Sequence, residues 1–199
     1  MPYQAPKQSR AQATEQRILN AFGALLLTHS YHDTTVNMIT ESASISHGAF
    51  MSRFGSKRAA LGRLFELYCE DVYQVLRRVA AGASASGLNL NDFAISVSRR
   101  YEQVVIEHWG ANRAMHEIFL KEGAIDEQTK GIFKQTVQVF HPIFCQLAKH
   151  EIALERTFSA VQLMVTLNYN YVLGAMPGLP SEGKARHMLI AKTMVSALQ

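Results

Sequence analysis

The chain has 199 residues, 48% of them hydrophobic, and a formal net charge of +4, which suits one or two small domains with a buried core. Its two cysteines, Cys69 and Cys145, are too few for a disulfide framework or a metal cluster, so we expect a reducing cytoplasmic location and no cofactor. The polar N-terminus is unlike a signal peptide, and polar residues interrupt the uncharged stretch 157–180, so we expect no membrane partner.

The first third of the chain predicts three helices. The first is expected over residues 14–28, and Thr35 is expected to cap a short second helix. Ser46 caps a third over 46–54, which Gly55 ends. Apolar residues recur at helical spacing along all three, namely Ile18, Phe22, Leu25, Leu26, Val36, Ile39, Ala43, Phe50 and Phe54. Two short helices joined by a tight turn behind a longer one form a helix-turn-helix pattern.

Two residues of this segment are costly for stability alone. Gly48 lies inside the third helix, where glycine costs about 1 kcal/mol relative to alanine, and Lys57 meets the positive end of the next helix dipole. A polyanion lying against these helix starts would favour both residues, whereas a close helix crossing and a solvated lysine are the alternatives. Residues 1–63 hold seven basic and three acidic residues, whereas the remainder is neutral, which indicates a nucleic-acid partner at this end.

The remaining chain predicts six further helices, with "AAGASASG" at 80–87 as a loop and a kink at Pro142. They are expected at about 57–81, 91–109, 113–121, 127–150, 157–176 and 181–198. We therefore predict an all-α fold of about nine helices, with three in a small basic domain over 1–56 and six in a larger neutral domain over 57–199.

Residues 14–61 resemble the DNA-binding domain of the TetR family of bacterial transcriptional regulators. The shared pattern comprises Ile18, Leu19, Ala21, Leu25, Tyr31, Thr34, Thr35, Ile39, Ala43, Ser46, Gly48, Phe54, Ser56 and Lys57. The chain departs from it at Ser30 and Ser44, where the family usually has glycine, and at Met51 and Ser52, where it usually has tyrosine and then histidine or tyrosine. If Ser30 and Ser44 are left-handed, each costs about 1 kcal/mol.

The resemblance implies that the third helix enters the major groove of a double-stranded DNA operator. We expect Thr35 and Lys57 to contact phosphates, and Gly48 to permit close backbone approach. Met51 and Ser52 are candidate base readers, and Asn37 and His47 are candidates for contact with a base or a phosphate. Lys7 and Arg10 form a basic arm that adds contacts or stays disordered.

The resemblance implies that the domain over 1–56 binds DNA and that the helical domain over 57–199 binds a ligand and dimerises. The family also implies a homodimer on a near-palindromic operator, repression, and release by a small apolar or aromatic effector. The dimerisation residues expected here are Val161, Met164, Val165, Asn168, Val172, Leu189 and Met194. Asn168 either fixes register in that interface or bonds within one chain. The effector is expected to contact Tyr68, Tyr101, Trp109, Met115, His116, Phe119 and Phe140, although aromatic residues at helical spacing are also ordinary core.

Three alternatives remain open: a ligand-independent DNA-binding regulator, a regulator that responds to thiol oxidation at Cys69 or Cys145, and a helical small-molecule enzyme. The enzyme is disfavoured because the segment "HEIF" at His116 has Leu120 where a zinc-protease helix needs its second histidine. No phosphate-binding loop, dinucleotide fingerprint or nucleophile elbow occurs either, so no catalytic residue is expected.

Overall fold

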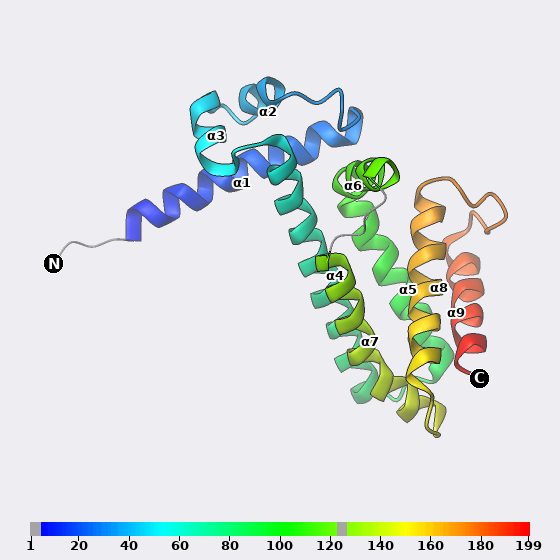
Figure 1. Ribbon diagram of the computed structural model, residues 1–199. Helices are drawn as coiled ribbons and strands as arrows, with labels where there is room; N and C mark the ends of the chain where they lie inside the picture. Colours follow the sequence, from blue (N-terminus) through cyan, green and yellow to red (C-terminus); the bar gives the residue numbers. More distant parts are fainter. Residues whose placement is uncertain (1–4, 123–126) are drawn as a thin grey trace. The chain divides into compact units, whose positions relative to one another are not determined.

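The computed structural model describes residues 5–122 and 127–199, and these residues form nine α-helices (Figure 1). The helices are α1 (Ala5–Thr28), α2 (Val36–Ser42), α3 (His47–Phe54), α4 (Lys57–Ser86), α5 (Leu90–Glu107), α6 (Trp109–Glu122), α7 (Glu127–Ala148), α8 (Leu154–Val172) and α9 (Gly183–Leu198). The all-α class with an N-terminal helix-turn-helix is confirmed.

Two helices are longer than their apolar stripes indicated. Helix α1 begins at Ala5 rather than near residue 14, because its first turns are rich in alanine, glutamine and basic residues that favour helix without forming an apolar face. The loop predicted at 80–87 was wrong for 80–86: α4 continues to Ser86, and its alanines outweigh Gly82. Gly87, at φ 63°, takes the left-handed conformation that ends the helix.

The later helices differ from prediction at their ends. Helix α5 ends at Glu107, and α6 begins at Trp109, four residues earlier than expected. Helix α8 spans Leu154–Val172 rather than 157–176. Gly174 follows it with φ 72°, which supplies a stop two residues before the expected end. Helix α7 continues through Pro142.

The described residues pack into two compact units. The N-terminal unit contains 5–68 and 108–122, and the C-terminal unit contains 69–107 and 127–199. Helix α6 therefore belongs with α1–α3 and the start of α4. This grouping differs from the division expected between residues 56 and 57, because α6 packs against α1.

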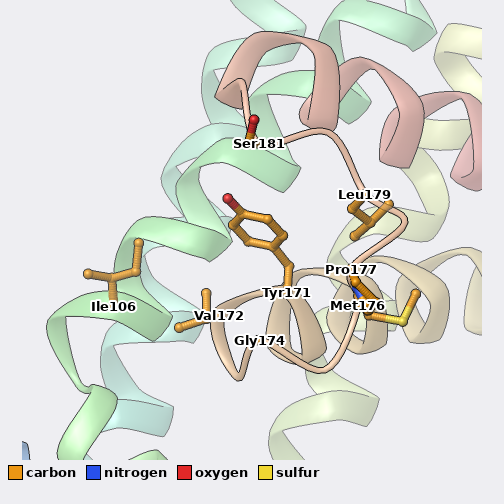
Figure 2. Close-up of a pocket in the computed structure, with 8 residues that line it drawn as sticks. All are labelled: Ile106, Tyr171, Val172, Gly174, Met176, Pro177, Leu179 and Ser181. Atoms are coloured by element: carbon orange, nitrogen blue, oxygen red, sulfur yellow. The ribbon is translucent and has the colours of Figure 1, made fainter.

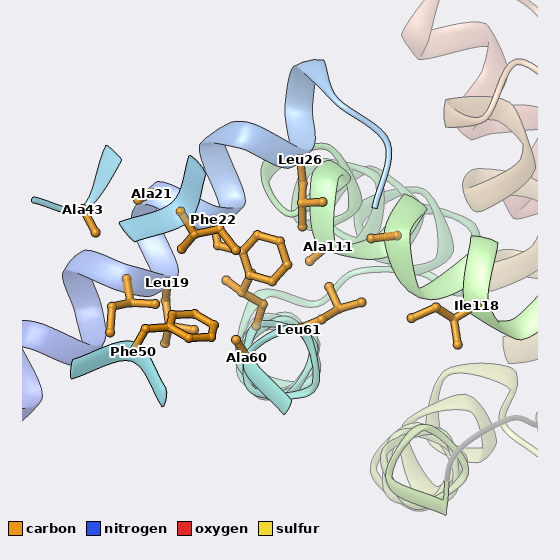
Figure 3. Packing of buried hydrophobic residues seen from close by; sticks show 14 residues of the cluster. Leu19, Ala21, Phe22, Leu26, Ala43, Phe50, Ala60, Leu61, Ala111 and Ile118 are labelled. Atoms are coloured by element: carbon orange, nitrogen blue, oxygen red, sulfur yellow. The ribbon is translucent and has the colours of Figure 1, made fainter. Parts of the chain in front are cut away.

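One apolar cluster holds the N-terminal unit together (Figure 3). Phe22 of α1, Phe50 of α3 and Leu61 of α4 are fully buried, and Ile118 brings α6 into the same cluster. Burying side chains of this size contributes about 1.5–3 kcal/mol each.

Helix α6 crosses α1 at a glycine. A Cβ built on Gly110 would come within 2.9 Å of the Leu26 Cβ and 3.1 Å of the Gly23 carbonyl oxygen. Real side chains do not approach so closely, so a larger residue would push the two helices apart. The crossing thus depends on glycine.

The C-terminal unit has its own aromatic core. Phe93 of α5 and Phe140 and Phe144 of α7 are fully buried, with ring centroids 5.6–5.8 Å apart. Helices α8 and α9 pack on each other and on α5. Within residues 5–122 and 127–199, no helix combines the length and the apolar character that a membrane crossing requires.

Candidate nucleic-acid interface

The turn between α2 and α3 is built by the capping residues that the sequence indicated. The Thr35 Oγ1 accepts from the Met38 N–H at 3.2 Å, and the Ser46 Oγ accepts from the Ala49 N–H at 3.2 Å. Ser44 is left-handed at φ 51°, so the condition for a cost of serine is met there. Ser30 does not have a positive φ and instead bonds Asp33 through its hydroxyl, so the condition is not met at Ser30.

Helix α3 has one buried face and one exposed face. Phe50 is fully buried, and its ring centroid lies 5.6 Å from that of the half-buried Phe54. His47, Gly48, Met51 and Ser52 are all exposed, and Met51 is 41% exposed although it is a large apolar side chain. The exposed face therefore carries the four candidate residues of α3 together, and Thr35 and Asn37 are exposed at the neighbouring α2.

Gly48 is not needed for internal packing. A Cβ built on it would meet only the Ser46 Oγ, at 4.0 Å, which is ordinary contact. The alternative of a close helix crossing at Gly48 is therefore wrong. Glycine at this helical position costs about 1 kcal/mol relative to alanine, and no packing contact within the chain requires it. The prediction that the exposed backbone at Gly48 permits the close approach of DNA stays a prediction.

Lys57 is tethered rather than freely solvated. Its Nζ donates to the Tyr31 carbonyl at 2.7 Å and to the Thr34 carbonyl at 2.6 Å, and it lies 4.2 Å from the centre of the Tyr31 ring. Burial lowers the pKa of Lys57, and the negative charge of Asp33 opposes that shift. Two of the three N–H donors of the ammonium group are thus bonded to backbone carbonyls. The cation is held beside Thr34, the residue that precedes Thr35.

Two other cations of this unit bind an internal acid. Arg53 of α3 and Arg63 of α4 lie 3.5 Å and 3.6 Å from the Glu15 carboxylate of α1. Arg53 also donates to the Ala11 carbonyl at 2.9 Å. These partly exposed pairs link α1 to α3 and α4, and each contributes less than about 1 kcal/mol. The side chains of Lys7 and Arg10 lie outside the described residues.

Helix α6 caps the end of α1, which sequence reasoning missed. Arg113 donates to the carbonyls of Leu26 and His29 at 2.6 Å each. The Tyr31 N–H donates to Glu117 at 3.1 Å. A cation at the last carbonyls of a helix also favours its dipole. In the sequence Arg113 is visible only as a basic residue, and the fold is what brings its guanidinium to the end of α1.

The residues expected to bind an effector fall in both units. Tyr68, Trp109, Met115 and His116 belong to the N-terminal unit, and the ring of Tyr68 lies 5.7 Å from that of His108. Tyr101 and Phe140 are buried in the C-terminal unit. The side chain of Phe119 lies outside the described residues.

A groove of about 490 Å³ lies elsewhere, in the C-terminal unit (Figure 2). None of the expected effector residues lines it. It is lined by Ile106 of α5 and, from the end of α8 and the following segment, by Tyr171, Val172, Gly174, Met176, Pro177, Leu179 and Ser181. Most of these side chains are apolar, and the hydroxyl groups of the lining belong to Tyr171 and Ser181.

The residues expected at a dimer interface divide by burial. Val161, Met164, Asn168 and Met194 are 0% exposed within the chain, so we remove them from the proposed contact surface. Asn168 bonds Ser98 and the Met164 carbonyl, which is the intrachain alternative. Val165 and Val172 are half-buried, whereas Leu189 is 41% exposed. Periodicity identified apolar faces without separating the inner face from the outer one.

In the part of the chain that the structure describes, no three His, Cys, Asp or Glu side chains gather where they could hold a metal ion. The N-terminal unit instead offers a capped helix-turn-helix with an exposed second helix, an uncrowded glycine and a tethered cation at its edge. Such an arrangement defines a helix-turn-helix DNA-binding protein.

Comparison with known proteins shows what the N-terminal segment is similar to. Residues 18–64 match the family model for bacterial regulatory proteins of the tetR family. This segment, which contains the helix-turn-helix, is therefore similar to the DNA-binding part of TetR-family transcriptional regulators. No curated protein sequence matches it.

Solved structures share the fold across nearly the whole chain. A protein from Mesorhizobium loti MAFF303099, described as a TetR-family transcriptional regulator, is similar with a TM-score of 0.71 and 17% identity, covering 95% of this chain and 96% of that one. PfmR, a TetR-family regulator from Thermus thermophilus, is similar with a TM-score of 0.66 and 13% identity, covering 92% of this chain and 99% of that one. A TetR-family regulator from Streptomyces coelicolor is similar with a TM-score of 0.64 and 15% identity, covering 94% of this chain and 80% of that one.

Proposed function

We propose that this regulator binds a near-palindromic operator as a homodimer, represses transcription there, and is released by a small apolar ligand. The observation that carries the DNA contact is the exposed face of α3 beside the tethered Lys57. His47, Met51 and Ser52 would read base edges in the major groove, together with Asn37 of α2. Thr35 and Lys57 would bind phosphates and set the register.

The dimer is supported by apolar side chains that α8 and α9 leave uncovered. Leu154 and Phe158 on α8 are 51% and 50% exposed, and Met188 and Leu189 on α9 are 52% and 41% exposed. Large apolar side chains that gather on two helices mark an interaction surface more often than isolated ones do. A second copy suits it, because a symmetric dimer presents two reading helices about 34 Å apart to successive major grooves.

The ligand is supported by the groove at the end of α8. Its volume of about 490 Å³ falls within the range of about 300–1,000 Å³ that small-molecule sites occupy. Its aliphatic walls and two hydroxyl groups favour a small apolar molecule with one or two polar atoms. Release requires that the ligand prefer a dimer that does not fit the operator, and a coupling of about 2 kcal/mol changes DNA affinity about thirtyfold.

The DNA proposal is tested by selecting bound duplexes from a random pool with the full chain. We expect the enriched sequences to contain two inverted half-sites. His47→Ala and Ser52→Ala should relax the preference at particular base pairs, whereas Lys57→Ala should weaken all sequences alike. Enrichment of one unpaired half-site would contradict the dimer, and no enrichment would contradict base reading by α3.

The dimer has its own test. Sedimentation at micromolar concentration should show a dimer for the wild type and a shift to monomer for Phe158→Ser with Leu189→Ser. The matched control is Gln162→Ser, on an exposed polar position of α8. A monomeric wild type would overturn the dimer.

The ligand is tested separately. A library of small aromatic compounds, screened by thermal shift, should give binders that Val172→Trp loses, because the larger side chain fills the groove. Binders that are indifferent to Val172→Trp, or a library without binders, would overturn the proposed ligand site.

A further inference from the structure

A buried polar cluster joins three helices of the C-terminal unit. It consists of Ser98 and Glu102 on α5, Asn168 on α8, and Arg186 and His187 on α9, and each of these residues is at most 7% exposed. We call it the Arg186 cluster. None of its residues is among the candidate DNA-contacting residues, and buried charges are costly unless they are well paired. The structure shows what the cluster holds in place.

Arg186 connects the cluster to the segment between α8 and α9, residues 173–182. Its Nε and Nη2 donate to the two carboxylate oxygens of Glu102 at 2.9 and 2.7 Å. Its Nη1 donates to the carbonyls of Pro180 and Ser181 at 3.1 and 2.9 Å. The guanidinium also stacks 3.7 Å from the centre of the Tyr171 ring. Glu102 thus orients a side chain that contacts the chain at both ends of this segment.

His187 shares the same carboxylate. Its Nε2 lies 3.7 Å from the Glu102 Oε1, and its Nδ1 lies 3.0 Å from the Ser98 Oγ. The Asn168 Nδ2 is 3.2 Å from the Ser98 Oγ. A neutral imidazole satisfies all of these hydrogen bonds at once: Asn168 donates to Ser98, Ser98 donates to Nδ1, and the Nε2–H points to Glu102.

The charged groups facing His187 act in both directions. Burial is the largest cause and lowers the pKa of His187; Glu102 of α5 raises it, and Arg186 of α9 and Arg99 of α5 lower it further. From α8 the ring faces the uncharged Asn168 through Ser98. The imidazole is therefore neutral at pH 7 and takes up a proton only below its ordinary value of about 6.5.

We propose that His187 is an acid-sensitive latch for the 173–182 segment. A protonated ring carries a donor at Nδ1, so Ser98 can no longer donate to it. The hydrogen bonds between His187, Ser98 and Asn168 must then rearrange. The new cation also competes with Arg186 for Glu102. Arg186 then loses the partner that orients it toward Pro180 and Ser181, and the segment opens.

The latch would make the regulator sensitive to acid. Its effect on DNA binding rests on the proposed function, namely on the dimer surface and the ligand groove. Residues 173–182 line most of the groove and lead into α9, where Met188 and Leu189 are exposed. Opening the segment would therefore alter the groove and the start of the α9 part of the proposed dimer surface together.

The test uses amide hydrogen exchange of the full chain without DNA, at about pH 7.5 and pH 5.5, values that bracket the titration range of histidine. After correction for intrinsic exchange rates, the wild type should lose protection over 173–182 in acid, by up to about tenfold for each unit that the His187 pKa differs between closed and open forms. His187→Asn, which retains a polar atom near the Nδ1 position, should not respond. His150→Asn, at an exposed histidine, should respond like the wild type.

Equal protection of the wild type at both pH values would overturn the latch, as would an acid response retained in His187→Asn. If that variant does not fold, NMR titration of the wild type decides: the His187 ring and the 173–182 amides should shift with one midpoint below about 6.5, and separate midpoints would overturn the latch. Sedimentation and DNA binding at both pH values then test the link to the dimer alone. If neither changes with pH, the latch stands and its proposed effect on the dimer and on DNA binding is overturned.

Discussion

Replacing Gly110 by alanine tests whether the α1–α6 crossing is as close as the structure indicates. The added Cβ would lie 2.9 Å from the Leu26 Cβ, 3.0 Å from the Leu26 carbonyl carbon and 3.1 Å from the Gly23 carbonyl oxygen. Two of these three atoms are backbone and the third is bonded directly to it, so no flexible side chain can move aside. The two helices must separate, or the unit must accept the overlap.

The cost can be estimated from two opposing terms. Overpacking a filled interior costs about 1–3 kcal/mol, and the rigid surroundings favour the upper end. Alanine regains at most about 1 kcal/mol through its better helix propensity. We therefore expect a net destabilisation of about 2 kcal/mol. In a chain of this size that lowers the Tm by about 4–8 °C.

Gly62→Ala in α4 is the matched control. A Cβ at Gly62 would meet nothing within 4 Å, so the same substitution gains propensity without a clash. Its Tm should rise by about 2 °C. Thermal unfolding followed by circular dichroism measures both variants. A Gly110→Ala protein that melts at or above the wild-type temperature would show that the helices are not in contact there.

Three further outcomes are expected. Lys57→Ala should weaken binding to all DNA sequences alike and lower the salt slope by about one, measured by anisotropy over a salt series; an unchanged slope would make Lys57 purely structural. Ser44→Gly should raise the free energy of unfolding by about 1 kcal/mol because it relieves a positive φ, whereas Ser30→Gly should lower it. Chemical denaturation measures both, and a Ser30→Gly protein more stable than Ser44→Gly would refute this. Arg186→Met should cost about 3–5 kcal/mol by leaving Glu102 buried without its cation, and a smaller loss on denaturation would show that water reaches the carboxylate.

The sequence predicted best what depends on neighbours in the chain. Thr35, Ser46 and Gly55 cap and end short helices through local bonds and backbone angles, so their roles followed from residue type and spacing. The face of α3 followed from the spacing of Phe50 and Phe54. These features carry the helix-turn-helix, which is why the DNA-binding class was accessible before the fold.

Contacts between distant residues were not accessible in the same way. Lys57 was assigned to phosphate, but its tether uses the carbonyls of Tyr31 and Thr34, and a carbonyl leaves no mark in residue type. Met164 and Leu189 are equally apolar, yet one faces the chain's own core and the other faces outward. Only the packing of α5 against α8 and α9 separates the two faces. The family resemblance supplied a dimer without supplying that distinction.

Trp109 is the only tryptophan of the chain, and it is the first residue of α6, next to Gly110. Its half-buried indole is therefore an intrinsic fluorophore at a single known place. A red shift of its emission reports solvent entry at the α1–α6 crossing, while the far-ultraviolet signal of the helices reports the chain as a whole. Recording both on one sample separates opening at this crossing from global melting, without any attached label.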